Sequence, residues 1–430
     1  CLVGSEMCIR DRLYTFIFYI IFSTLIFASP SPDLIAEGAI LIEPQTKTIL
    51  YSKNSHSRFY PASTTKVLTS LLLVESMDEN VVITKSQDSI QKVPSDSSHI
   101  GLSVGDQYGY KDGIHAIMMG SDNFVSHDMA LYNAGSIESF ARKMNEKAQS
   151  LGATSSHFVN PHGYHDPNHY TTPYDLSLIT TAAFNNPIVS QIAGTPLYDF
   201  HVLNKGTVLP LKHTAAFFKK DSPFYNEHVI AAKTGYHTPA GRTLVAKAKY
   251  DGLDLIAVVM KSNNPGHFED INKLFEYGSS NFKAIKDENG DLLLQNTSYS
   301  SWGQSYVETA LINGWLKPTT KSYMDSTTGH TFLMMLERML PDNLQYTFVP
   351  YALPTSPVYR INQPISYAES LKILNSITDT LNIGTGAVEV TRPSSTSPDS
   401  NLTLEEATYL IDKLSTLLLQ YGPIHPGLYK

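Results

Sequence analysis

Three short motifs, far apart in the chain, constrain it most strongly, because together they describe one kind of active site. Ser63-Thr64-Thr65-Lys66 is an S-x-x-K motif, Ser121-Asp122-Asn123 is an S-x-N motif, and Lys233-Thr234-Gly235 is a K-T-G motif. Each pattern alone is weak, since a serine–lysine pair on a helix is usually solvated surface and K-T-G is usually a turn. In this order within one chain, they predict a single nucleophilic site.

The first motif places a serine where a base can activate it. Residues 63–73 read as a largely apolar helix, so Ser63 lies beside the unpaired N–H groups of a helix start. Lys66 follows three residues later, so the two side chains meet across one helical turn. A serine hydroxyl is a weak nucleophile until a base takes its proton. A lysine can be that base only where burial or a nearby positive charge lowers its pKa.

The other two motifs carry groups suited to the remaining steps of such a reaction. Lys233 is a second cation that could lower the pKa of Lys66 and hold an anionic substrate. Ser121 could relay a proton to a leaving amine. The amide of Asn123 offers both a donor and an acceptor with which to orient a substrate.

The segments around these motifs resemble the D-alanyl-D-alanine carboxypeptidases, the low-molecular-mass penicillin-binding proteins of the S11 peptidase family. Residues 39–75, 140–179 and 233–262 carry the resemblance, which extends over roughly residues 36–283. It implies a peptidase that removes the terminal D-alanine of peptidoglycan stem pentapeptides through an acyl-enzyme, and that β-lactams acylate. It implies no cofactor and no metal.

Carried over by position, the resemblance implies that Ser63 is the nucleophile, Lys66 the general base and Ser121 a third catalytic residue. Asn123 would line the same wall of the site as Ser121. The chain departs from the family at Phe124, because a small or acidic residue usually follows the asparagine. This departure puts the shape of that wall in question without removing a named catalytic group.

The resemblance also implies how substrate is bound. Lys233 and Thr234 would bind the C-terminal carboxylate from the edge of a strand, and Gly235 would allow close approach of the backbone. The oxyanion hole would consist of the backbone N–H groups of Ser63 and Tyr236, which requires no particular side chain.

Local patterns predict an α+β domain over residues 33–283, in which an antiparallel sheet is flanked by helices, as in penicillin-binding proteins and β-lactamases. Apolar runs bounded by turn residues predict strands, and longer amphipathic runs predict helices. The expected strands are 39–42, 48–51, 229–233, 244–249 and 253–260, and the expected helices are 63–77, 136–151, 175–184 and 268–282.

Four histidines crowd residues 157–169, with Asp166 among them. Histidines at such spacings can converge on zinc. However, no H-E-x-x-H or H-x-H pattern occurs, and Pro161, Gly163 and Pro167 predict a loop. We therefore favour a turn held by side-chain hydrogen bonds over a metal site.

The amino-terminal residues predict export. Residues 13–27 form an uncharged apolar run after Arg10 and Arg12, and the small residues 28–31 follow it. This pattern is typical of a signal peptide over residues 1–32, with an uncleaved membrane anchor as the alternative. The first dozen residues resemble a translated sequencing adapter. We expect an extracytoplasmic protein of the cell envelope that is free, membrane-held or wall-bound.

The chain changes character after residue 283. A polar linker is expected over residues 284–300, and helices are expected at 302–314, 329–340, 365–381 and 403–421, the last opening with a Thr403/Glu406 capping box. The region 301–430 loosely resembles S-layer homology modules, which implies binding to a secondary wall polymer. A helical domain of unassigned role is the alternative.

Composition narrows the function further. The net charge is −8, from 32 basic and 40 acidic residues, and this balance argues against nucleic acid as a partner. Three hypotheses remain: a D,D-carboxypeptidase, a serine β-lactamase, or a wall-associated protein with a vestigial peptidase domain. The β-lactamase class requires a deacylating glutamate in an E-x-x-L-N motif, and none occurs between the S-x-N and K-T-G motifs.

Overall fold

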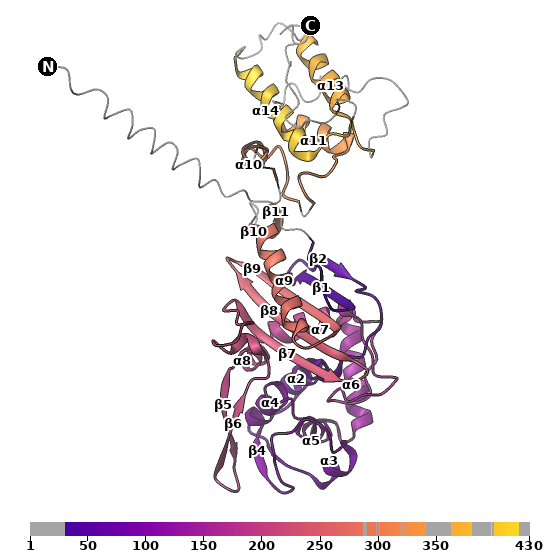
Figure 1. The fold of residues 1–430 in the computed structure, drawn as a ribbon, viewed down its shortest axis with the longest axis vertical. Coiled ribbons are helices and arrows are strands. Elements are labelled where there is room, and N and C mark those ends of the chain that lie inside the picture. The colour runs from indigo at the N-terminus through magenta and orange to yellow at the C-terminus, as the bar shows by residue number, and fades with distance from the viewer. Residues whose placement is uncertain are drawn as a thin grey trace, which may run out of the picture. The chain divides into compact units, whose positions relative to one another are not determined.

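The computed structural model describes residues 31–286, 290–297, 299–300, 302–319, 321–340, 363–380, 397 and 400–420. The chain divides into two compact units (Figure 1). The larger unit contains residues 30–280 and 284–293, and the C-terminal unit contains residues 281–283 and 294–430. The predicted signal segment lies outside the described residues apart from its last two. Of the helices described, none combines the length and hydrophobicity that crossing a membrane requires.

A five-stranded antiparallel sheet organises the larger unit. Its strands lie in the order β2-β1-β9-β8-β7, and pairing is antiparallel throughout. The strands are β1 (Gly38–Glu43), β2 (Thr48–Lys53), β7 (Val229–His237), β8 (Gly241–Tyr250) and β9 (Leu253–Ser262). The K-T-G motif therefore lies within an edge strand, one side of which pairs with β8.

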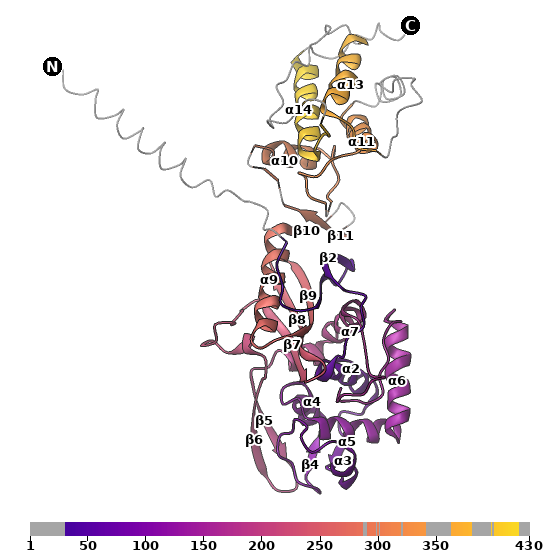
Figure 2. The same cartoon turned by 45° about the vertical axis from the view of Figure 1, so that its right-hand side comes forward.

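Helices cover both faces of this sheet, which explains why β8 and β9 are almost continuously buried (Figure 2). On one face lies α9 (Gly266–Asn281). Its buried Asp270 accepts hydrogen bonds from the backbone N–H groups of Ile35 (2.9 Å) and Ala36 (2.8 Å), just before β1. On the other face lie α2 (Lys66–Ser76) and α7 (Pro173–Asn185).

A helical lobe surrounds α2, which is buried on nearly all sides. A 3-10 turn, η1 (Ala62–Thr65), precedes it. The remaining helices and turns of the larger unit are α3 (Gln87–Lys92), α4 (Tyr110–Met118), α5 (Asn123–Ala134), α6 (Ile137–Ser150), α8 (Pro187–Ala193) and η2 (Ala216–Phe218). Two small antiparallel sheets pair β3 (Val82–Thr84) with β4 (Gln107–Gly109), and β5 (Leu197–Val202) with β6 (Thr207–Lys212).

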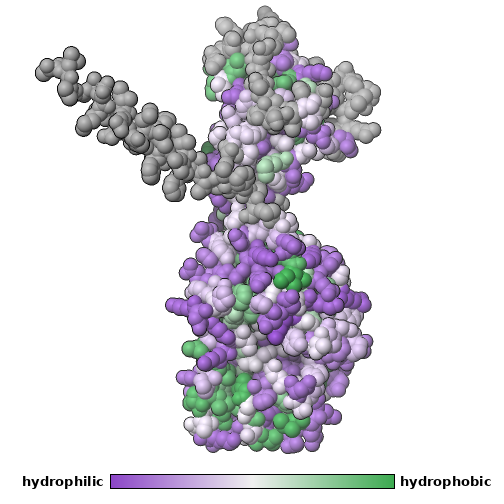
Figure 3. All heavy atoms as spheres, in the orientation of Figure 1, coloured by the Kyte–Doolittle hydropathy of each residue, from purple (hydrophilic) through white to green (hydrophobic). Residues whose placement is uncertain are grey.

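The predicted architecture, an antiparallel sheet flanked by helices, is confirmed, but several elements were not anticipated, and three groups of them show why. The first is α4 and α5; α5 is buried on most sides and mixes polar with apolar residues, so it shows no single apolar stripe. The second is the β5–β6 hairpin, which exposes Leu197, Leu203 and Val208 in an apolar area visible in Figure 3. Because these exposed residues are apolar, the hairpin lacks the alternation of apolar and polar residues from which a half-buried strand is predicted.

The third group lies in the segment expected to be a linker. There, β10 (Phe282–Lys286) pairs with β11 (Leu292–Asn296) as a separate two-stranded sheet. The segment expected to be a polar linker thus contains strand residues of β10 and β11. The two strands escaped prediction because their apolar runs are short and flank a polar stretch of sequence.

The C-terminal unit is mainly helical, with α10 (Gln304–Ile312), α11 (Gly329–Met339), α13 (Tyr367–Thr380) and α14 (Leu404–Gln420). The predicted capping box opens α14: Thr403 Oγ1 accepts from the Glu406 N–H (3.2 Å), and a Glu406 carboxylate oxygen accepts from the Thr403 N–H (3.0 Å). Ser366 and Glu369 make the same reciprocal pair at α13.

The segments that precede α11, α13 and α14 pair with one another in a closed ring. Each segment makes one backbone bridge to each of the other two, at Ser326↔Thr403, Thr328↔Pro364 and Ser366↔Asn401. A strand-like entry followed by a helix therefore recurs three times around a common centre. This recurrence indicates an internal repeat of three related helical modules.

Candidate active site

The S-x-x-K motif forms a buried serine–lysine pair. Lys66 is fully buried, and its Nζ lies 3.0 Å from Ser63 Oγ. The same nitrogen lies 2.6 Å from Asn123 Oδ1 and 2.8 Å from the backbone oxygen of His162. Three acceptors from three separate segments thus fix this side chain with its nitrogen against the serine hydroxyl.

A second serine–lysine pair stands on the opposite side of the site. Lys233 Nζ donates to Ser121 Oγ at 3.0 Å and to the backbone oxygen of Thr234 at 2.8 Å. Lys233 is also fully buried. The structure therefore brings all three sequence motifs together in one place, although they are widely separated along the chain.

Burial determines the charge of both lysines. It lowers the pKa of Lys66 well below the ordinary value of 10.5, and the positive charge of Lys233 lowers it further. Burial also lowers the pKa of Lys233 to about 7. Since the charged form of Lys66 is disfavoured by both effects, Lys66 is suited to accept a proton from Ser63.

The backbone is strained next to both serines. Ala62, directly before Ser63, has a φ of +48°, and Ser121 itself has a φ of +55°. Residues other than glycine rarely occupy this left-handed region, and such strain is often retained at functional sites. At the first serine, hydrogen bonds from the Thr64 and Thr243 hydroxyls to the Pro61 oxygen (2.7 and 2.8 Å) hold the turn against β8.

The K-T-G strand passes so close to Ser63 that only glycine fits at position 235. A Cβ on Gly235 would lie 2.9 Å from the Ser63 nitrogen and would also collide with the Thr243 hydroxyl. Beside it, Thr234 Oγ1 is 2.8 Å from Thr214 Oγ1. The side chain of Tyr236 is more than half exposed, so this residue is available to the site through its backbone.

The S-x-N turn is held by its middle residue. Asp122 caps α5 by accepting from the Val125 N–H, and its other oxygen accepts from the Ile100 N–H, both at 2.8 Å. Phe124 packs over the Lys85 ammonium at 4.5 Å and edge-on to His99. The phenyl ring that departs from the family pattern is therefore accommodated by packing within the helical lobe.

The histidine-rich loop supports Lys66, a role that the sequence did not reveal. Its His162 carbonyl accepts from Lys66, as described above, and its Pro161 carbonyl accepts from the Thr69 hydroxyl at 2.6 Å. His169 Nε2 lies 2.8 Å from Thr65 Oγ1, and burial lowers the pKa of His169 to about 3.

Any residue can supply a backbone carbonyl, so the identity of the loop residues does not reveal this role. The sequence contains only one indirect indication of it. That indication is Gly163, which has a φ of +79° and whose Cβ would collide with the Ala62 carbonyl. Within the described part of the chain, no three histidine, cysteine, aspartate or glutamate side chains are grouped so as to hold a metal ion.

The close approach of Gly235 to Ser63 yields a test. We expect Gly235→Ala to slow acylation of Ser63 by a β-lactam about a hundredfold, because the added methyl displaces the serine backbone. Stopped-flow acylation with benzylpenicillin would measure the rate. Gly109→Ala, where a Cβ meets only ordinary contacts, serves as the control. An unchanged rate in Gly235→Ala would show that this approach is not required.

Comparisons with known proteins agree with this geometry. The family model described as D-alanyl-D-alanine carboxypeptidase matches residues 26–264. A curated relative, D-alanyl-D-alanine carboxypeptidase DacF of Bacillus subtilis, is 32% identical over 252 residues, which cover 58% of this chain and 63% of that protein. The chain thus spans less than two thirds of that relative's length.

Solved structures show the same fold. The structure of a Streptomyces DD-transpeptidase is 25% identical with a TM-score of 0.54, and the match covers 58% of this chain and 98% of that one. A D-alanyl-D-alanine carboxypeptidase from Mycobacterium tuberculosis gives 25% identity, a TM-score of 0.53 and coverages of 58% and 93%. Because the family model covers more than half of the residues, this chain belongs to the S11 family of D-alanyl-D-alanine carboxypeptidases.

Proposed function

We propose that the larger unit is a serine-type D-alanyl-D-alanine carboxypeptidase that removes the terminal D-alanine of peptidoglycan stem pentapeptides. The observation that carries this proposal is the pair of serine–lysine contacts, each 3.0 Å long, whose lysines both bond residues of the S-x-N turn in one site. Family membership supports the same reaction, and β-lactams are the covalent inhibitors expected of it.

Acylation follows from these contacts. Lys66 Nζ takes the proton of Ser63 Oγ, and the oxygen attacks the carbonyl carbon between the two D-alanines. The backbone N–H groups of Ser63 and Tyr236 stabilise the resulting oxyanion. When the C–N bond breaks, the leaving D-alanine amine receives a proton from Ser121, which Lys66 replenishes.

Substrate recognition and deacylation use the remaining groups. Lys233 and the Thr234 hydroxyl bind the C-terminal carboxylate of the substrate, and Asn123 orients its amide backbone. After D-alanine departs, a water molecule attacks the acyl carbonyl with Lys66 again as the base, and Ser63 is released.

The two alternative functions are less well supported. A serine β-lactamase needs a carboxylate to activate the deacylating water. In the part of the chain that is described, the groups hydrogen-bonded to Lys66 Nζ are a hydroxyl, an amide oxygen and a carbonyl oxygen. A vestigial site is disfavoured because the nucleophile, both lysines and their partners are all present.

Intact-mass analysis of the protein after incubation with benzylpenicillin tests the proposed function. We expect a single adduct of one inhibitor mass on the wild type and on the control Ser76→Ala, which changes an exposed serine of α2. Ser63→Ala should fold but form no adduct, because it lacks the attacking oxygen. An adduct on Ser63→Ala would refute Ser63 as the nucleophile.

We further propose that the protein acts in the cell envelope and that its C-terminal unit binds an anionic wall polymer. The substrate class supports the location, as does the apolar amino-terminal segment in the sequence. A pocket of about 360 Å³ in the C-terminal unit supports the binding role, because its lining includes the basic side chains Lys317, Lys321, His330 and Arg338. The threefold recurrence of helical modules agrees with the loose resemblance to S-layer homology modules.

Cosedimentation with purified cell-wall sacculi tests this second role. We expect the paired change Lys317→Gln and Lys321→Gln to weaken binding several-fold, because it removes two positive charges from the pocket. The paired change Lys286→Gln and Lys372→Gln, which removes the same charge elsewhere, should bind as the wild type does. Equal weakening in both pairs, or no binding by the wild type, would contradict the proposal.

A further inference from the structure

A pocket of about 640 Å³ is lined by residues from the same chain segments that form the active site. Tyr60 lies three residues before Ser63, and Pro239 and Ala240 follow the K-T-G strand. Pro167 and Asn168 belong to the loop whose His162 carbonyl holds Lys66. The walls of the pocket are therefore tied directly to the catalytic groups.

The direction of the bound substrate leads toward this pocket. If Lys233 and Thr234 hold the terminal carboxylate and the reacting carbonyl lies near Gly235, the rest of the peptide extends along the edge of β7 toward His237. The strand from Gly235 to His237 covers about 7 Å, and the turn that contains Pro239 and Ala240 begins directly after it. One substrate residue with a long side chain can span a comparable distance.

Aromatic and imidazole rings lie between the nucleophile and the pocket. The Tyr60 ring packs edge-on to His165 at 4.7 Å, and His165 lies 5.2 Å from His237 between ring centroids. Burial and the neighbouring His165 lower the pKa of His237 to about 4. This passage thus presents flat ring surfaces, with His237 uncharged at neutral pH, against which the methylene groups of a long side chain can pack.

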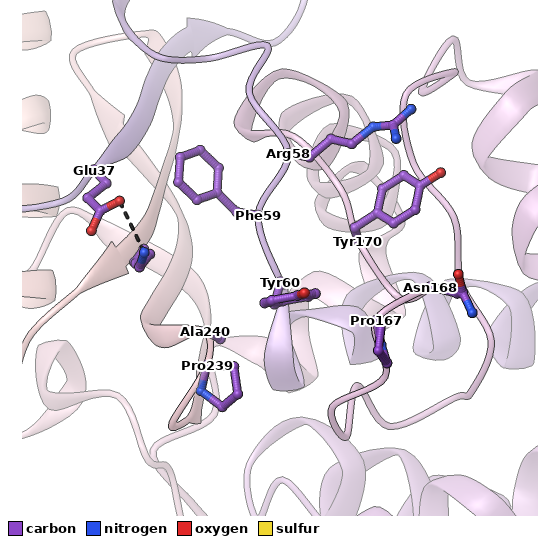
Figure 4. A pocket seen from close by; sticks show the side chains of 10 residues that line it. Glu37, Arg58, Phe59, Tyr60, Pro167, Asn168, Tyr170, Pro239 and Ala240 are labelled. Carbon is purple, nitrogen blue, oxygen red and sulfur yellow. Dashed lines mark ion pairs between the residues drawn. The ribbon is translucent and has the colours of Figure 1, made fainter.

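Charges of both signs lie at the far walls. Figure 4 shows Glu37 with its ion pair on one side, Arg58 and Tyr170 on the other, and Tyr60 between them. The partner of Glu37 is Lys261, 3.3 Å away, and both side chains are about half exposed. The Arg58 guanidinium lies 4.4 Å over the Tyr170 ring. Such a pocket offers a carboxylate to an ammonium group and a guanidinium to a carboxylate.

We propose that this pocket selects the diamino acid at the third position of the stem peptide, with Arg58 binding a terminal carboxylate and Glu37 a terminal ammonium. The proposal rests on the proposed carboxypeptidase function and adds a specificity for zwitterionic side chains. It predicts that diaminopimelate is preferred to lysine, and that lysine is preferred to a neutral side chain.

Kinetics with three acyl tripeptides that end in D-Ala-D-Ala test this specificity, the variable residue being meso-diaminopimelate, lysine or Nε-acetyl-lysine. For the wild type, kcat/KM should fall at least tenfold from the first substrate to the third. Arg58→Gln should lose about tenfold on the diaminopimelate substrate and less than twofold on the lysine substrate, because only the first has a terminal carboxylate. Glu37→Gln should weaken both amine-bearing substrates but not the acetylated one.

Two controls separate the pocket from the catalytic groups. Arg142→Gln, which changes an exposed arginine of α6, should leave all three substrates unaffected. Benzylpenicillin lacks the third residue, so it should acylate Arg58→Gln and Glu37→Gln at the wild-type rate. Equal rates on all three substrates, or an equal loss on all three in Arg58→Gln, would overturn the specificity while leaving the carboxypeptidase in place.

The proposed function can fail independently, if benzylpenicillin acylates Ser63 but none of the three substrates is hydrolysed. The pocket is then tested by calorimetric binding of the three product dipeptides, each ending in one D-alanine, to Ser63→Ala. The same order of affinities would support the pocket, and equal affinities would overturn it.

Discussion

The burial of Lys66 beside Ser63 is the contact on which the rest of this site depends. A buried ammonium group is costly unless it is paired or loses its proton, and the described groups that hydrogen-bond to Lys66 Nζ are a hydroxyl, an amide oxygen and a carbonyl oxygen. Burial and the charge of Lys233 both lower its pKa. The environment that would destabilise a structural lysine therefore suits this one to act as a base.

Holding a lysine in such a position requires several independent segments. The three acceptors come from the turn before α2, from the first residue of α5 and from the histidine-rich loop. The sheet contributes through β8, whose Thr243 fixes the turn before Ser63, and through β7, where Gly235 permits the strand to reach it. The packing of helices on the sheet thus brings these segments together around Lys66 and Ser63.

The sequence predicted the side chains of this site better than it predicted their support. Motif spacing predicted that two serines and two lysines share one site, and the structure brings these four side chains together, since their proposed chemistry requires particular side chains. The carbonyl of His162 escaped prediction because any residue can supply a backbone oxygen. The strands of the main sheet were foreseen from their apolar runs, whereas α5 and the β5–β6 hairpin were not, because buried polar residues in the first and exposed apolar residues in the second break the expected periodicity.

The most direct test of this account is the protonation state of Lys66 itself. In protein labelled with ¹³C at lysine Cε, the Lys66 signal, assigned by its loss in Lys66→Gln, should titrate at a pH well below the ordinary 10.5. In Lys233→Gln the midpoint should move to higher pH, because removing a neighbouring positive charge favours the charged form of Lys66. A Lys66 signal that titrates near 10.5, unmoved by Lys233→Gln, would contradict the account, because the lysine would then be charged at neutral pH and unable to take the proton of Ser63.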